Sequence, residues 1–176
     1  MSDDSSGELP AALARLLDKE QIREQIYRYC RAVDRGDKEL MRQVYHPDAT
    51  DSHGVFEGPA SEFVELDIDD VMPGLKLTTH FVGNILIELA GDAAKVESYV
   101  VAFHRVELVE ESCDLVVWGR YLDRFERRHG AWKIAHRRCV FDGIRRDKAS
   151  ADWSMPWCAN FRPLGRRDVE DPLFKS

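Results

Sequence analysis

The sequence predicts an α+β fold in which N-terminal helices pack on a curved antiparallel sheet, together forming a cone-shaped α+β barrel. Three observations support this prediction. Up to about residue 45, apolar residues recur every three or four positions, as on one face of a helix. From Thr78 onward they alternate with a period of two, as in half-buried strands. Short separators join the alternating segments, which favours hairpins and an antiparallel meander.

Composition narrows the class of protein. The 176 residues are 44% hydrophobic and 32% charged, which suits one folded domain. The net charge of −7 argues against a nucleic-acid partner, because nucleic-acid binders usually carry a basic face. No apolar run reaches membrane-spanning length, and the first residues lack the pattern of a signal peptide. We therefore expect a cytoplasmic protein with no membrane partner.

The first part of the chain predicts two successive helices after a disordered tail over residues 1–8. One helical segment begins at Pro10. A stronger one begins at Asp18, which can cap it together with Gln21. Its apolar stripe consists of Ile22, Ile26, Tyr29 and Val33. Gly36 is the expected end of this helix.

A mixed region follows. Asp37 can cap a short helix, which the sequence His46-Pro47-Asp48 should end. We expect a strand over Ala49–Glu57, a turn at Gly58-Pro59 and a further helix over Ala60–Val71.

Four long strands should complete a domain over residues 9–145. Their expected ranges are Thr78–Leu89, Ala94–Leu108, Asp114–Arg127 and Trp132–Ile144. Residues 146–176 contain several aromatic residues but no regular period. We expect this C-terminal extension to pack on the barrel or on a neighbouring subunit.

Cysteine usage and metal-ligand spacing both favour a site without metal. The four cysteines are widely spaced and form no close pair, so reduced, buried thiols are expected. Asp51, His53 and His104 show no tight ligand spacing. We therefore predict no metal site.

The first strand of the meander carries an unusual polar pattern. His80, Val82 and Asn84 share one face of it if the alternation is regular. A histidine and an amide on an otherwise apolar face need polar partners. From the residues alone, His80 is either a satisfied core histidine or a catalytic one.

Two residues of the first long helix are further candidates. Asp34 lies in its last turn, at the border of the apolar stripe, where a solvated acid is the simpler interpretation. Tyr29 lies on the stripe, as a core residue or as a hydroxyl that needs a partner.

Other candidates lie on the predicted pocket wall. Arg137 is either an inward cation for an anionic group or a surface residue of a basic strand. The open end of a cone-shaped barrel forms a pocket. We therefore expect four residues to contact substrate there: Tyr45, His53, Val82 and Asn84.

Several segments together resemble SnoaL-like proteins of the nuclear-transport-factor-2-like superfamily over residues 15–145. The segments are 29–37 (YCRAVDRGD), 45–49 (YHPDA), 58–59 (GP), 79–84 (THFVGN) and 119–134 (GRYLDRFERRHGAWKI). The resemblance is strongest to cofactor-independent dehydratases, dehydrochlorinases and diarylpropane lyases.

The resemblance implies a catalytic dyad of His80 as base and Asp34 as its orienting partner. It also implies that Tyr29 and Arg137 are electrostatic helpers. The pocket lysine of the dehydrochlorinases has no counterpart here, since Tyr29 occupies its position. An oxygenated substrate is therefore favoured over a chlorinated one.

We therefore expect a cofactor-free lyase that dehydrates, or cleaves by a related C–O or C–C elimination such as deformylation, a hydrophobic hydroxylated small molecule. Aromatic lignin-derived and steroid-like compounds are the expected classes. The alternatives are a non-catalytic ligand-binding or assembly module of the same fold, or a polyketide cyclase or isomerase. The resemblance also implies a homo-oligomer, with a trimer favoured over a dimer.

Overall fold

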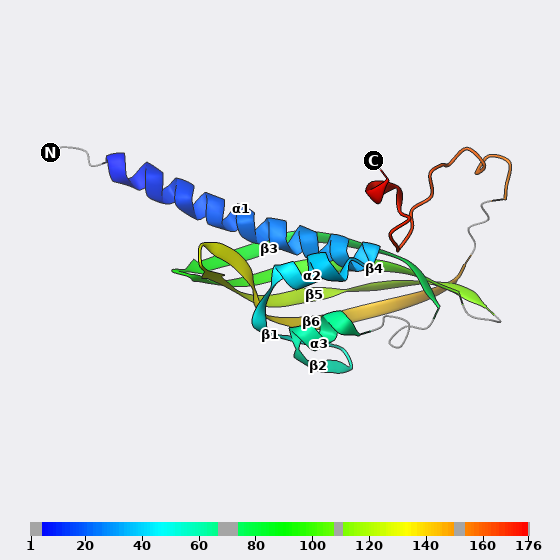
Figure 1. Ribbon diagram of the computed structural model, residues 1–176, viewed down its shortest axis with the longest axis horizontal. Helices are drawn as coiled ribbons and strands as arrows, with labels where there is room; N and C mark the ends of the chain where they lie inside the picture. The colour runs from blue at the N-terminus through cyan, green and yellow to red at the C-terminus, as the bar shows by residue number, and fades with distance from the viewer. Residues whose placement is uncertain (1–4, 67–73, 108–110, 150–153, 176) are drawn as a thin grey trace.

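A computed structural model describes residues 5–66, 74–107, 111–149 and 154–175 (Figure 1). Its helices are α1 (Ser5–Arg35), α2 (Lys38–Val44), α3 (Ala60–Glu65) and a 3₁₀ turn, η1 (Pro172–Phe174). Its strands are β1 (Tyr45–His53), β2 (Phe56–Pro59), β3 (Leu75–Ala90), β4 (Ala93–Glu107), β5 (Ser112–Arg128) and β6 (Ala131–Lys148). Among these residues, no helix is long and apolar enough to cross a membrane.

The six strands form one curved sheet in the order β2-β1-β6-β5-β4-β3. The pairs from β3 to β6 are antiparallel, as the short separators predict, whereas β1 runs parallel to β6. The sheet stays open, with β2 and β3 at its edges. Figure 1 shows α1 and α2 along one face of it. The predicted α+β class, with helices packed on a curved sheet, is confirmed.

The N-terminal helix differs from the prediction, because α1 is one continuous helix. It begins at Ser5, inside the segment expected to be a disordered tail, and residues 1–4 lie outside the described residues. Asp18 is therefore not a helix cap. Its carboxylate instead accepts hydrogen bonds from the Trp132 indole and the Arg127 guanidinium, each at 2.8 Å. These bonds tie the middle of α1 to the sheet.

The end of α1 is as predicted, and it fixes the position of Asp34. Gly36 adopts a left-handed φ of 65°, which glycine tolerates without strain. The Asp37 N–H bonds to the Ala32 carbonyl at 2.9 Å and closes the helix end. Asp37 then caps α2 by accepting the Leu40 N–H at 2.9 Å. Asp34 thus occupies the last helical turn, held rigidly next to the sheet.

The elements after α1 differ from the prediction in their bounds. α2 ends at Val44, so the helix stops just before residues 46–48, as predicted. The expected turn at Gly58-Pro59 lies within β2, and the single strand expected over Ala49–Glu57 is divided between two strands. Of these, β1 starts at Tyr45, earlier than expected, and ends at His53. Its pairing with β6 is interrupted between Tyr45 and Thr50, which accommodates Pro47 without a donor N–H. α3 ends at Glu65, and residues 67–71 of the predicted helix lie outside the described residues. β6 continues to Lys148, past the expected domain boundary at 145.

The main hydrophobic core lies between α1 and the inner face of the sheet, the face toward the helices. It includes Ile22 and Ile26 of α1 with Phe125, Trp132 and Ile134 of β5 and β6. All five are almost fully buried. Since these residues hold the C-terminal half of α1 against the sheet, the core also sets the geometry of the candidate site.

Candidate active site

Asp34 and His80 form a tight pair at the inner face of β3. The Asp34 Oδ1 lies 2.7 Å from His80 Nδ1, and Oδ2 accepts the His80 backbone N–H at 3.0 Å. The Thr78 hydroxyl donates a further bond of 2.5 Å to Oδ1. Asp34 is only 9% exposed. The predicted dyad residues are therefore brought together, and Thr78 is a third partner that was not predicted from the sequence.

Electrostatics fixes the protonation of this pair. Burial raises the pKa of Asp34, but hydrogen bonds from His80 and Thr78 and the charge of His80 outweigh it and lower the pKa overall. Asp34 is therefore ionised at neutral pH, and an ionised carboxylate only accepts hydrogen bonds. His80 must then carry its proton on Nδ1. In the neutral ring, Nε2 keeps a lone pair that can take a proton from a substrate.

His104 is a second imidazole beside the dyad. It lies on β4 opposite Thr78, and its ring meets the His80 ring edge to face at 5.8 Å between centroids. Burial and the nearby His80 lower its pKa to about 4, so it is neutral at pH 7. Its Nδ1 is buried without a hydrogen-bond partner among the described residues. In the sequence His104 stands out only as a possible metal ligand, although the pairing of β3 with β4 places it beside His80.

Replacing His104 with glutamine should flatten the pH dependence of stability. The pKa of His104 is near 6.5 in the unfolded chain and falls to about 4 in the folded protein. The unfolded state therefore binds more protons between these values, and stability falls as the pH falls. Between pH 7.5 and pH 5, His104 should account for a loss of about 2 kcal/mol. Urea unfolding at both values measures this loss.

The matched control for this prediction is His136→Gln, on the other face of the sheet, where His136 Nδ1 contacts the Thr50 hydroxyl at 2.7 Å. This control leaves His104 in place, so it measures the effect of losing a histidine elsewhere on the sheet. An unchanged slope in His104→Gln would contradict the prediction.

Arg137 and Tyr29 lie in a different environment from the predicted one. Arg137 is 0% exposed and pairs with Asp123 through Nε at 2.8 Å and Nη2 at 2.7 Å. The rings of Tyr29 and Tyr121 cover its guanidinium, with centroids 4.0 and 4.1 Å away. Arg137 is therefore not a surface residue. It points inward, but its charge is already paired with Asp123 and does not face an open pocket as a cation for substrate. The geometry favours a structural role for Arg137 and Tyr29.

Tyr45 and His53 belong to a second buried polar group. The Tyr45 hydroxyl donates to Asp51 Oδ2 at 2.5 Å. His53 Nδ1 lies 3.1 Å from the Cys139 sulfur and 3.6 Å from Asp51 Oδ1. Burial raises the pKa of the Cys139 thiol, so it stays protonated and donates to His53. The His53 ring also stacks on Phe63 of α3 at 4.9 Å.

Val82 and Asn84 do not share a face, which corrects the prediction for Asn84. Between Gly83 and Leu86, two residues of β3 stand opposite a single residue of β4. This bulge reverses the alternation, and Asn84 adopts a φ of 48° with an exposed side chain. Val82 precedes the bulge and packs against the core on the same face as His80. Only Val82 is therefore placed beside the dyad.

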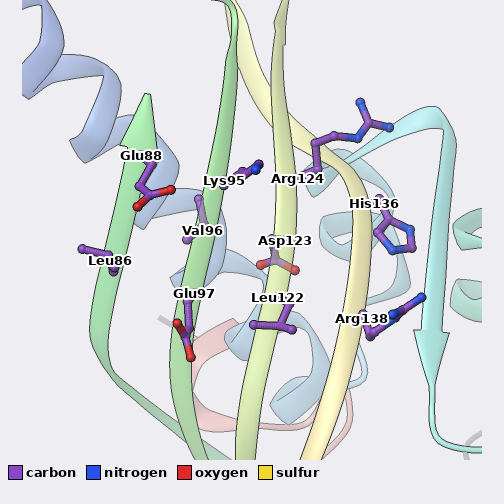
Figure 2. Close-up of a pocket in the computed structure, with 10 residues that line it drawn as sticks. All are labelled: Leu86, Glu88, Lys95, Val96, Glu97, Leu122, Asp123, Arg124, His136 and Arg138. Atoms are coloured by element: carbon purple, nitrogen blue, oxygen red, sulfur yellow. The ribbon is translucent and has the colours of Figure 1, made fainter. Parts of the chain in front are cut away.

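A hollow of about 480 Å³ lies away from the dyad, across β3 to β6 (Figure 2). Figure 2 shows this outer face with the helices behind the sheet. The hollow has acidic Glu88 and Glu97 on one side and basic Arg124 and Arg138 on the other. None of the described residues that line it was predicted to be catalytic. In the described part of the chain, no group of three metal-ligating side chains is close enough to hold an ion.

This fold and the buried carboxylate–imidazole pair define an α+β protein of the nuclear-transport-factor-2-like class, with helices over a curved sheet. The chain belongs to the SnoaL-like domain family, whose sequence model matches residues 14–138. No curated protein matches it significantly by sequence.

Solved structures share the fold. A hexachlorocyclohexane dehydrochlorinase (LinA, type 2) matches with a TM-score of 0.71 and 20% identity, over 82% of this chain and 98% of that one. A scytalone dehydratase-like protein from Novosphingobium aromaticivorans matches with 0.65 and 21%, over 78% and 92%. A protein of unknown function from Mycobacterium tuberculosis matches with 0.60 and 22%, over 78% of each chain. At these identities the likeness shows the fold alone.

Proposed function

We propose that the protein is a cytoplasmic, cofactor-independent lyase that dehydrates a hydrophobic hydroxylated small molecule or cleaves it by a related C–O or C–C elimination. Aromatic lignin-derived and steroid-like compounds are the proposed substrate classes. The observation that carries the proposal is the Asp34–His80 pair, an ionised carboxylate bonded to one imidazole nitrogen beside an apolar core. The four cysteines are all free, which suits a reducing compartment.

The proposed chemistry needs only side chains of this chain. His80 Nε2 takes a proton from the carbon next to the C–OH bond, and the C–H electron pair forms the C=C bond. The C–O bond breaks, and the imidazolium returns the proton to the departing hydroxyl, which leaves as water. Asp34 stabilises the transient imidazolium. His104, neutral and beside His80, is the proposed hydrogen-bond partner for the substrate oxygen.

A substrate screen tests the function. The full-length protein, treated with a metal chelator, is incubated with phenolic and steroidal hydroxy-compounds. Conversion to an ultraviolet-absorbing alkene, with loss of one water by mass spectrometry, is the expected result. Compounds that bind and are recovered unchanged would favour the non-catalytic binding module. Products isomeric with the substrate would favour a cyclase or isomerase.

We also propose that the protein assembles as a homotrimer, with a dimer as the alternative. Phe81, Val101 and Trp118 are exposed and lie side by side on β3, β4 and β5, on the outer face of the sheet. An exposed apolar patch of neighbouring strands favours protein–protein contact. Light scattering should give a multiple of the chain mass for the wild-type protein and the single chain for Trp118→Glu. A monomeric wild-type protein would contradict the proposal.

A further inference from the structure

The C-terminal extension returns to the end of α1, next to Asp34. In Figure 1 its last residues lie beside that end of the helix. Arg167 Nε donates to the Val33 carbonyl at 3.1 Å. The Arg167 carbonyl oxygen lies so near Gly36 that a Cβ there would meet it at 3.4 Å. The extension therefore touches the turn of helix that carries Asp34, from both its side chain and its backbone.

Asp171 anchors the extension at this place. It is 4% exposed and accepts the Arg166 and Leu173 N–H groups at 2.8 and 3.0 Å. Its Oδ1 also lies 3.6 Å from Arg35 Nε. Arg35 in turn donates to the Asp34 carbonyl at 3.0 Å. A continuous set of polar contacts therefore links the extension to the backbone of the dyad aspartate.

Negative and positive groups meet at this end of α1. A carboxylate in the last turn faces the negative end of the helix dipole, which disfavours its ionised form. Arg167 and Arg35 each bring a cation to a carbonyl of that turn. They offset the dipole where Asp34 must remain charged. The charge of Arg167 also reaches His104, where it adds to burial and to His80 in lowering the pKa, while Asp34 acts in the opposite direction.

We propose that Arg167 is a positioning residue of the dyad, delivered by the C-terminal extension to hold the last turn of α1 so that the Asp34 carboxylate meets His80. This proposal rests on the proposed function and adds to it, because the C-terminal extension then helps to position a residue of the catalytic dyad. Arg167 acts through Val33 and Asp34, without contacting the reacting atoms.

The experiment compares Arg167→Gln and Arg167→Lys with Arg162→Gln in the full-length protein. Arg162 is exposed on the same extension, and within the described part of the chain its guanidinium bonds only locally, to the Phe161 carbonyl at 3.0 Å, so it is the matched control. Two readouts need no substrate. They are the nuclear magnetic resonance titration of His104 and the downfield Nδ1–H signal of His80 hydrogen-bonded to Asp34.

Arg167→Gln should raise the pKa of His104 above about 4, because a charge that lowers this pKa is lost. It should also broaden the His80 Nδ1–H signal, because the turn of α1 that carries Asp34 loosens. Arg167→Lys should recover most of the His104 titration, since it keeps the charge, and Arg162→Gln should match wild type. With a substrate in hand, Arg167→Gln should lower kcat roughly tenfold to a hundredfold with little change in KM.

Unchanged His80 and His104 signals in a folded Arg167→Gln protein would overturn the proposal. A failed substrate screen would still leave these two signals readable. The failure of the proposed function can therefore be distinguished from the failure of the proposal for Arg167. Equal changes in Arg162→Gln would also overturn it, because they would reflect a general loosening of the extension.

Discussion

Replacing Arg137 with methionine is expected to lower the free energy of unfolding by about 3–5 kcal/mol, because it leaves the buried Asp123 carboxylate without its partner. Both Asp123 oxygens bond to Arg137, and neither side chain reaches solvent. The rings of Tyr29 and Tyr121 would also lose the cation between them. Urea unfolding followed by circular dichroism measures the loss.

The pH dependence of this variant gives a second readout. Burial raises the pKa of Asp123, and Arg137 opposes this rise. Without Arg137 the pKa of the folded carboxyl rises further above its unfolded value. The folded state then holds a proton that the unfolded state releases as the pH increases. Arg137→Met should therefore be least stable at high pH and recover part of its stability in mild acid.

Two comparisons separate the buried charge from a loss of packing. Arg120→Met removes an arginine from exposed ion pairs with Glu97 and Asp142, and its effect should be small. The double variant Arg137→Met/Asp123→Leu should recover much of the lost stability, since it removes both charges of the buried pair. If the double variant were as unstable as Arg137→Met, packing rather than charge would explain the loss.

Arg137 illustrates what the sequence could and could not predict. Alternation along its strand limits the residue to one of two faces, but the choice depends on where the strand pairs. The structure puts Asp123 of β5 directly opposite Arg137. That register follows from the whole hairpin and cannot be read from Arg137 or its neighbours alone. The sequence therefore indicates a cation for substrate or a surface residue, and it does not reveal the carboxylate that already neutralises Arg137.

The difference between local patterns and strand pairing also explains the other correct and incorrect predictions. Helix and strand periods are local, so the helical first part of the chain and the four-strand meander agree with the prediction, whereas the division of α1 into two helices does not. The bulge after Gly83 inserts one extra residue and moves Asn84 away from the face of His80, a change that alternation cannot foresee. Asp34 and His80 were paired through the resemblance, whereas Thr78 emerges only from the packing of α1 on β3, and His104 from the pairing of β3 with β4.

Replacing His80 with alanine, or Asp34 with asparagine, is expected to lower kcat/KM on a substrate found by the screen by roughly 10²–10⁴-fold. His80→Ala removes the proposed base. Asp34→Asn keeps the size of the side chain but loses the charge that fixes the Nδ1 proton and stabilises the imidazolium. Because the two residues act as one unit, the double variant should be little worse than either single one. Initial rates of alkene formation measure all three.

His136→Ala is the matched control for this dyad, since it removes a histidine that borders the outer hollow instead. It should keep wild-type turnover, and thermal unfolding should show that every variant is folded. Substrate binding by the folded His80→Ala protein would separate a lost chemical step from a lost site. Wild-type turnover in His80→Ala or Asp34→Asn would refute the proposed roles, because no proton transfer could then depend on the pair. Side chains 2.7 Å apart in a working dyad act together, so their losses should not add. Additive losses in the double variant would mean that Asp34 and His80 act independently, and would contradict the dyad.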